Sequence, residues 1–223
     1  MILVHHLEHS RSQRILWLLE ELGVPYEVKR YPRDAKTQLA PPELKAIHPL
    51  GKSPVISDGE RTIAESGAIV EYLVDQHGQG RFRPAPGSAA FERYRYWIHA
   101  AEGSVMPLLV MKLVFAKTTQ PPVPFVVRPI TRAVAAEVGR SYIEPGIRAH
   151  LAHMEDALAH STWFAGDELS GADFLMSFPV EAAASRVDMA PYPRLEAFLE
   201  RVQERPAYRR ALERGGPYRI LDS

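Results

Sequence analysis

The amino-acid sequence predicts an α/β domain followed by an all-helical domain. The first 31 residues read as strand, helix and strand, which is typical of a unit with two parallel strands. Asp58-Gly59 lies between two apolar runs, a strong signal for a β-hairpin. The run Gly78–Gly87 has the Gly- and Pro-rich composition of a linker, and only helical patterns follow it. We therefore expect one domain at residues 1–78 and a second at 88–223.

The first helix should follow a short apolar strand, Met1–Val4. Apolar residues recur every 3.6 residues up to Gly23, which should end the helix. Ser10 and Gln13 have the spacing of a capping box, in which the serine hydroxyl binds free backbone N–H groups. A helix start also stabilises negative charge, so the Ser10 hydroxyl could instead donate to an anion such as a thiolate. The pattern alone favours the cap, and the two roles are compatible.

The rest of the first domain should add two strands and two helices. Val24–Tyr31 alternates as a second strand, and a short helix is expected after Pro41-Pro42. The run Gly51–Ile56 reads as a turn and a strand. The Asp58-Gly59 turn should connect this strand to the second strand of a hairpin. Glu65-Ser66 should start another helix. The predicted order is βαβ-α-ββα.

Composition narrows the chemistry. The chain has 223 residues and no cysteine, with 27 Lys plus Arg against 27 Asp plus Glu. It therefore cannot form disulfides, thiolate metal sites or an enzyme-borne thiol nucleophile. A zero formal charge favours neither nucleic acid nor an acidic membrane as a partner. We find no secretory leader and no apolar run long enough for a bilayer, so a cytoplasmic location is expected.

Three features in order resemble the thioredoxin-like domain of the cytosolic glutathione S-transferase superfamily: the helix-opening Ser10, the run Gly51–Ile56 and Glu65-Ser66. The runs Arg11–Leu22 and Trp97–Leu109 resemble its serine-type, bacterial and fungal branch. The resemblance covers nearly the whole chain. It implies an α/β + all-α fold, with a thioredoxin-like N-terminal domain and an all-helical C-terminal domain that carries the second-substrate site.

The resemblance also assigns roles to residues. It implies that Ser10 is the catalytic donor to the glutathione thiolate, with Ser12 as the next candidate. Glutathione binding is assigned to Lys52, Ser53, Pro54, Glu65, Ser66 and His48. A cis Pro54 would expose the backbone of Ser53 to the cysteinyl part of glutathione. Ser66 would hold the γ-glutamyl carboxylate, Glu65 the amino group and Lys52 the glycyl carboxylate, and His48 could assist.

The second domain should consist of helices. The first, Ala89–Lys117, contains Pro107, which should bend it. A proline-rich connection, Thr118–Pro129, leads to another long helix. Ser170 and Asp173 have capping-box spacing at the start of a buried helix. The candidate walls of a second-substrate pocket are Tyr94, Trp97, Met106 and Phe115, although packing in the core or at a dimer surface is the favoured explanation for any one of them.

These observations predict an enzyme in which the glutathione thiolate attacks an electrophilic, mostly apolar substrate. Glutathione would be a co-substrate, and no metal or other cofactor is required. A homodimer is expected by analogy, with no nucleic-acid or membrane partner. The sequence leaves open a glutathione-dependent peroxidase, which shares the thiolate site, and a non-catalytic protein that binds glutathione or another ligand with the same fold.

Overall fold

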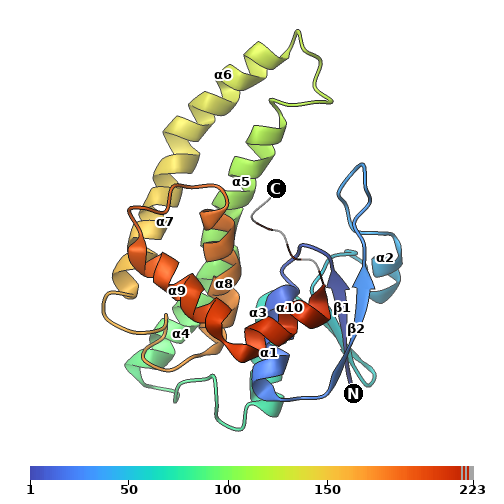
Figure 1. The fold of residues 1–223 in the computed structure, drawn as a ribbon, viewed down its shortest axis with the longest axis vertical. Coiled ribbons are helices and arrows are strands. Elements are labelled where there is room, and N and C mark those ends of the chain that lie inside the picture. The colour runs from blue at the N-terminus through green and yellow to red at the C-terminus, as the bar shows by residue number, and fades with distance from the viewer. Residues whose placement is uncertain (217, 219, 221–223) are drawn as a thin grey trace.

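The computed structural model describes residues 1–216, 218 and 220. Its N-terminal part contains a four-stranded sheet with the order β2-β1-β3-β4. In Figure 1 this sheet lies to one side, and the helical part rises beside it. The elements of the N-terminal part are β1 (Ile2–Leu7), α1 (Gln13–Leu22), β2 (Tyr26–Tyr31), α2 (Glu43–Ile47), β3 (Val55–Asp58), β4 (Arg61–Ala64) and α3 (Ser66–His77). This order confirms the predicted βαβ-α-ββα sequence of elements.

The sheet is built around β1. β2 pairs with it in parallel, and β3 pairs with it in antiparallel orientation. β3 and β4 form the expected hairpin, with Asp58 opposite Arg61. β1 is longer than the predicted Met1–Val4 because it is the central strand and pairs with β2 as far as Leu7. His5 and His6 are therefore buried strand residues.

The start of α1 differs from the prediction. The helix begins at Gln13, and Ser12 occupies the capping position. Gln13 is thus the first helical residue and not the third, so the predicted capping box of Ser10 and Gln13 is wrong. The amide atoms of the Gln13 side chain are buried and have no hydrogen-bond partner among the described residues. The end of the helix is as predicted: Gly23 adopts φ +69°, and its N–H donates to the Leu19 carbonyl.

The C-terminal part is helical throughout its regular structure. Its elements are α4 (Ala89–Ala100), η1 (Ala101–Val105), α5 (Met106–Lys117), α6 (Arg128–Val138), η2 (Gly139–Ile143), α7 (Glu144–Ala157), α8 (Gly171–Ala184), α9 (Pro193–Glu204) and α10 (Pro206–Gly215). The predicted helix Ala89–Lys117 is continuous, but its hydrogen bonding changes to a π-helical turn in η1. Pro107, which cannot donate a backbone hydrogen bond, lies directly after that turn.

The segment Ala89–Lys117 is long and apolar enough to cross a membrane by length and composition. The expectation that the chain has no such run is therefore wrong. In the structure Trp97, Ile98 and Leu109 of this segment are buried in the core that also contains residues of α8. Only 33% of the apolar window is buried, so packing accounts for part of its composition.

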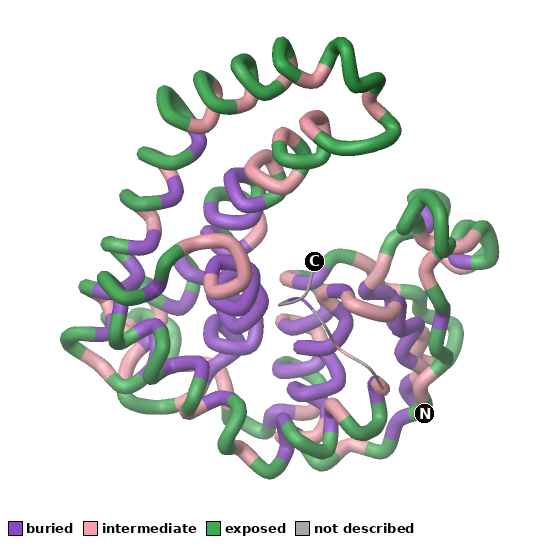
Figure 2. The backbone as a smooth tube through the Cα atoms, turned by 45° about the horizontal axis from the view of Figure 1, so that its top comes forward, coloured by how far each residue is buried: buried purple, intermediate pink, exposed green. Residues whose placement is uncertain are grey.

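α8 lies at the centre of the core. Its residues are buried from Gly171 to Ala183, and Figure 2 shows buried backbone concentrated in α8, α1 and the lower part of α5, while α6 is mostly exposed. The Asp173 carboxylate accepts hydrogen bonds from the backbone N–H groups of Ser170 and Phe164, both at 2.8 Å, which confirms the predicted capping box. Burial raises the pKa of Asp173 to about 6 against the effect of these hydrogen bonds. α1 packs on α8 through Trp17 and Phe174, whose rings lie 4.4 Å apart, and so joins the two parts.

Candidate active site

A polar cavity of about 210 Å³ lies where the start of α3 faces η1. All six residues that the sequence assigned to glutathione binding line it: Lys52, Ser53, Pro54, Glu65, Ser66 and His48. Arg11 and Glu102 line it as well, the latter from η1 in the helical part. The structure thus brings together the six residues that the resemblance named, and their binding roles stay predictions.

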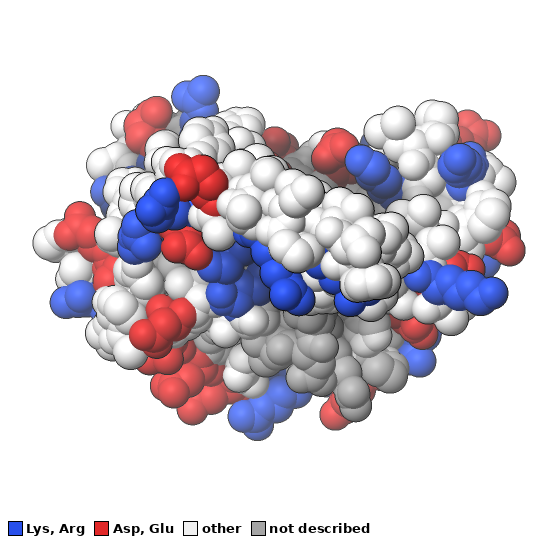
Figure 3. Space-filling view, turned by 90° about the horizontal axis from the view of Figure 1, so that it is seen from above, with Lys and Arg blue, Asp and Glu red and all other residues white. Residues whose placement is uncertain are grey.

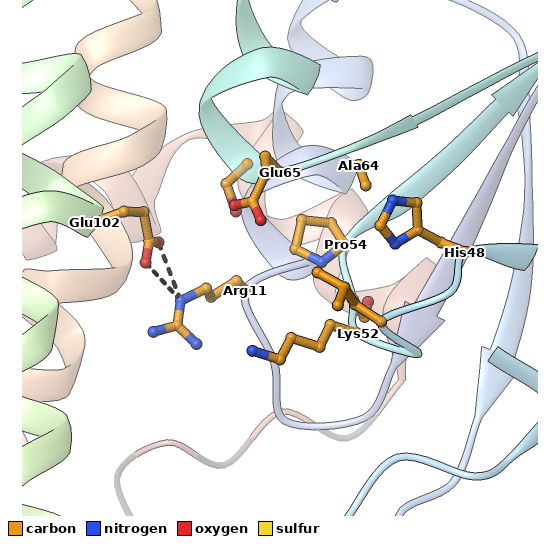
Figure 4. Close-up of a pocket in the computed structure, with 10 residues that line it drawn as sticks. Arg11, His48, Lys52, Pro54, Ala64, Glu65 and Glu102 are labelled. Atoms are coloured by element: carbon orange, nitrogen blue, oxygen red, sulfur yellow. Dashed lines mark hydrogen bonds and ion pairs between the residues drawn. The ribbon is translucent and has the colours of Figure 1, made fainter. Parts of the chain in front are cut away.

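The backbone at the start of α3, which borders this polar cavity, has an unusual conformation. Glu65 has φ +71° and ψ 127°, a conformation that costs a non-glycine residue about 1–3 kcal/mol and that is concentrated at functional sites. Ser66 begins the helix, where the first backbone N–H groups have no partner within it. Figure 4 shows the Glu65 carboxylate pointing into the space between Pro54 and Glu102. The cavity thus combines a carboxylate with a helix N-terminus that attracts anions.

The Ser66 hydroxyl is oriented by Arg14. Nη2 of Arg14 donates to Oγ of Ser66 at 2.8 Å, and Nη1 donates to the Leu175 carbonyl at 2.7 Å. Arg14 is buried, as is Ser66. Because a guanidinium is only a donor, it fills a lone pair of Oγ and leaves the hydroxyl proton for another acceptor. An acceptor in the polar cavity can take that proton.

Glu102 joins this arrangement to the helical part. Nε of Arg11 lies 3.0 Å from each of its carboxylate oxygens, and Nη2 of Arg14 also donates to it. Burial alone would raise the pKa of Glu102, but the charges and hydrogen bonds of Arg14 and Arg11 outweigh it, so the pKa is lowered. Glu102 is therefore ionised at neutral pH and compensates the buried charge of Arg14. The Nη groups of Arg11 have no hydrogen-bond partner among the described residues.

The loop before β3 forms the opposite wall. The Ser53–Pro54 peptide bond is cis, as the resemblance implied. Oγ of Ser53 donates to the His5 carbonyl at 2.9 Å and accepts from the Leu7 N–H at 3.3 Å. Through these bonds the side chain of Ser53 holds the loop against β1. The backbone groups of Ser53 are not used in them, so they can bind a ligand. In Figure 4 the Lys52 side chain extends toward the Arg11 side of the polar cavity.

A second, apolar cavity of about 460 Å³ lies along α5. Of the four residues predicted for a second-substrate pocket, only Met106 lines it. Tyr94 and Trp97 are buried, and Trp97 packs on Phe164 with ring centroids 4.8 Å apart, because this stretch of α4 faces the core. Phe115 borders a different cavity, which also contains residues of α6. Tyr94, Trp97 and Phe115 therefore do not line this cavity, and their predicted pocket roles stay predictions.

Comparisons with known proteins agree with this geometry. Residues 1–75 match the family model described as the glutathione S-transferase N-terminal domain, and residues 118–206 match that of the C-terminal domain. Glutathione S-transferase 3 of Schizosaccharomyces pombe is 37% identical over 217 residues, which cover 96% of this chain and 88% of that protein. Glutathione S-transferase 1 of Saccharomyces cerevisiae is 33% identical over 223 residues, covering 96% and 95%. The chain belongs to the glutathione S-transferase family.

A solved structure of the family has the same fold. A glutathione S-transferase from Actinobacillus pleuropneumoniae is 35% identical and superposes with a TM-score of 0.79, covering 100% of this chain and 95% of that one. The thioredoxin-like N-terminal domain and helical C-terminal domain are therefore those of the family. Among the described residues of this glutathione S-transferase, no group of three or more His, Asp and Glu is arranged to hold a metal ion.

The predicted thiolate donors of this transferase lie outside the polar cavity. Ser10 and Ser12 are both buried, and neither lines it. Their hydroxyls bond to each other at 2.8 Å, and Oγ of Ser12 lies 2.8 Å from Nδ1 of His6. Burial lowers the pKa of His6 to about 4, with Arg30 and His9 adding to the effect, so the ring is neutral at pH 7. The donor role of Ser10 stays a prediction.

The residues that sequence reasoning missed are Arg11, Arg14 and Glu102. Two of them carry a readable signal. Arg14 directly precedes the apolar run Ile15–Leu19, which is buried, and Glu102 lies between the buried Ile98 and Val105. A buried charge needs a partner, so one cation and one anion on two buried helix faces could have been paired.

Proposed function

We propose that this glutathione transferase binds glutathione in the polar cavity and directs its thiolate at an electrophile bound in the apolar cavity. The observation that supports this most is the position of Arg11. Among the described residues, Arg11 alone lines both cavities. The sulfur of one substrate must meet the reacting carbon of the other where the two cavities join.

The charges of the polar cavity complement those of glutathione. The Glu65 carboxylate suits its amino group, while the Ser66 hydroxyl and the N-terminus of α3 suit the γ-glutamyl carboxylate. Lys52 suits the glycyl carboxylate, and the backbone of Ser53 suits the peptide groups of the cysteinyl residue. With its two ends held in this way, the thiol of glutathione faces the Arg11 side.

The thiol must be ionised to react, and a cysteine-like thiol has a pKa of about 8.5. Lowering this pKa by about two units requires roughly 2.7 kcal/mol of preferential stabilisation of the thiolate. The guanidinium of Arg11 offers Nη donors and a positive charge at the junction of the cavities. Hydrogen bonds to charged groups contribute about 1.5–3 kcal/mol, so one such contact is sufficient in size. The thiolate then attacks the electrophile, and the thiol proton passes to solvent.

The experiment compares two reactions of the purified protein. We expect chlorodinitrobenzene to be conjugated in the presence of glutathione, with a C–S bond formed and chloride released. Reduction of cumene hydroperoxide, measured in parallel, should be the slower reaction. Faster hydroperoxide reduction would assign the protein to glutathione-dependent peroxidases. Glutathione binding with neither reaction would make it a binding protein of the same fold.

The proposal extends to assembly and location. Similarity to the family supports a homodimer in the cytoplasm. Analytical ultracentrifugation should give about twice the 25.0 kDa mass of the chain. A monomeric mass at micromolar concentration would reject the dimer and leave the proposed reaction untouched, since both cavities are formed by one chain.

A further inference from the structure

The apolar cavity has one continuous apolar wall. Met106, Leu109, Val110 and Leu113 line it at positions i, i+3, i+4 and i+7 of α5, so they form one stripe along the helix. Phe178 of α8 lines the same space. α5 has 12 residues, so the distance from Met106 to Lys117 is about 17 Å along the helix axis. The wall therefore suits an elongated apolar body.

The remaining lining of this cavity is cationic. Besides Arg11, it contains Arg33, Lys117 and Arg186, while no Asp or Glu lines it within the part of the chain that the structure describes. Figure 3, which views the molecule from above, shows Lys and Arg gathered along the middle of that face beside uncharged side chains. Such a site attracts negative charge, and it does so most strongly when one sign of charge lines a cleft with apolar walls.

Arg33 is fixed in its place in this lining. Its guanidinium donates to the backbone carbonyls of Glu8 at 2.9 Å, Gln38 at 2.8 Å and His9 at 3.2 Å. Carbonyl groups are neutral acceptors, so these bonds hold the side chain without cancelling its charge. Lys117 is exposed at the C-terminal end of α5. A fixed cation and a flexible cation thus border the same apolar wall.

We propose that the electrophile of this enzyme is an amphipathic anion, with an elongated apolar body and an acidic group such as a carboxylate. The apolar body lies on the α5 stripe, the acidic group lies beside Arg33 and Lys117, and the electrophilic carbon lies near Arg11. This inference rests on the proposed function, because it names the substrate class of the same site.

Long-chain alkenals with and without a terminal carboxylate provide the test. The thiolate adds to the β-carbon of the alkenal and forms a C–S bond. The electrons of the C=C bond move toward the carbonyl oxygen, and the resulting enolate takes a proton from water at the α-carbon. The addition has no leaving group and needs no oxidant, so the two substrates differ only in the terminal charge.

We expect kcat/KM for the carboxylated alkenal to exceed that for the neutral alkenal of equal length by roughly tenfold, and this preference to decline with added salt. Lys117→Gln should reduce the preference about two- to fivefold, and the double variant Arg33→Gln/Lys117→Gln should abolish it. The control is Lys112→Gln. Lys112 is also on α5, but it pairs with Glu144 at 3.4 Å and borders the other cavity, so the preference should not change.

A binding measurement separates this inference from the proposed function. Anilinonaphthalenesulfonate, an anionic dye, should bind at least several-fold more tightly than the neutral N-phenylnaphthylamine, and the double variant should remove the difference. Equal affinity of the two dyes, together with equal kcat/KM for the two alkenals, would overturn the anionic substrate class while leaving conjugation intact. Loss of all conjugation with the dye preference retained would instead reject the proposed reaction.

Discussion

Two serines at helix starts, Ser66 as the first residue of α3 and Ser10 before α1, were expected to present hydroxyls to glutathione, but their surroundings in the structure differ. Ser66 lines the polar cavity, and Arg14 donates to its oxygen. Ser10 lies outside that cavity, and its hydroxyl belongs to the chain Ser10–Ser12–His6. Both serines are buried and hydrogen-bonded, so burial does not distinguish them.

The two serines differ in whether their hydrogen-bond partner can accept the hydroxyl proton. A guanidinium can only donate, so the Ser66 proton must find another acceptor. Ser12 and a neutral histidine can each donate or accept, so the Ser10 hydroxyl can donate its proton to Ser12. The type of neighbour therefore decides whether a buried hydroxyl is available to a ligand.

The largest expected effect comes from Arg14→Met, which removes the group that orients Ser66. Among the described residues, Glu102 then keeps Arg11 as its cationic partner. The variant also leaves the Ser66 hydroxyl and the Leu175 carbonyl without this donor, at about 1–3 kcal/mol each, so the free energy of unfolding in urea should fall by about 2–6 kcal/mol. Arg83→Met is the matched control: Arg83 pairs with Asp75 at the surface, where such a pair contributes about 0–1 kcal/mol. Similar losses in the two variants would show that Arg14 has no special structural role.

The next effect is a pH dependence of stability that originates at His6, which contacts the hydroxyl of Ser12. Burial lowers its folded-state pKa to about 4, whereas the unfolded chain titrates near 6.5. Below pH 6.5 the histidine of the unfolded chain is protonated, whereas His6 of the folded protein stays neutral until the pH approaches 4. Stability from His6 is therefore fully present above pH 6.5 and is lost as the pH falls toward 4, by about 3 kcal/mol in total.

Urea unfolding of wild type and His6→Asn between pH 7 and pH 4 measures this contribution. Asp173 acts in the opposite sense over the same range. Its pKa is raised to about 6, so its contribution is present below 3.8 and is lost as the pH rises through 6. Because both proteins contain Asp173, the difference between them isolates the contribution of His6. A pH-independent difference between wild type and His6→Asn would mean that His6 has the same pKa in the folded and unfolded protein.

Ser66→Ala tests the other side of the comparison. The loss of a hydrogen bond to a charged carboxylate should weaken glutathione binding by about 1.5–3 kcal/mol, or roughly 10- to 150-fold in Kd. Since this contact is remote from the sulfur, KM should rise while kcat stays close to normal. Calorimetric titration with glutathione measures Kd, and Ser66→Thr, which keeps the hydroxyl, should retain most of the affinity. An unchanged Kd in the alanine variant would remove Ser66 from the site.

Local sequence signals predicted much of this fold, and the resemblance to glutathione S-transferases named six of the residues that line the polar cavity. The Asp58-Gly59 turn, the Gly23 stop and the Ser170 capping box each depend on residues close together in the chain, and each is found in the structure. The contact of Arg14 with Ser66 joins residues 52 positions apart, and that of Arg11 with Glu102 spans 91. Contacts of this range depend on how the elements pack, which no local pattern encodes.

Three of the four residues predicted for the second-substrate pocket do not line the apolar cavity, for a related reason. A helical pattern shows which residues share a face, but it does not show which neighbour that face meets. Tyr94 and Trp97 were chosen as large apolar residues, and they turned out to fill the core. The stripe that includes Leu109 and Leu113 is equally periodic, and only the packed structure distinguishes a cavity wall from a core face.

The smallest expected effect, that of Ser10→Ala, bears most directly on the comparison. Since Ser10 lies outside the polar cavity, we expect a loss of about 1 kcal/mol in stability, the usual size for one hydrogen bond, and little change in the thiol pKa of bound glutathione. Arg11→Gln should raise that pKa by about one to two units, because it removes the cation at the junction of the cavities. The ultraviolet absorbance of the thiolate, titrated against pH in both variants, measures these shifts. If Ser10→Ala raised the thiol pKa by a unit or more while Arg11→Gln left it unchanged, the donor role inferred from the sequence would hold. The Ser10 hydroxyl would then have to leave Ser12 when glutathione binds, and the same titration of Ser12→Ala would show whether His6 and Ser12 hold it in the orientation that donates to sulfur.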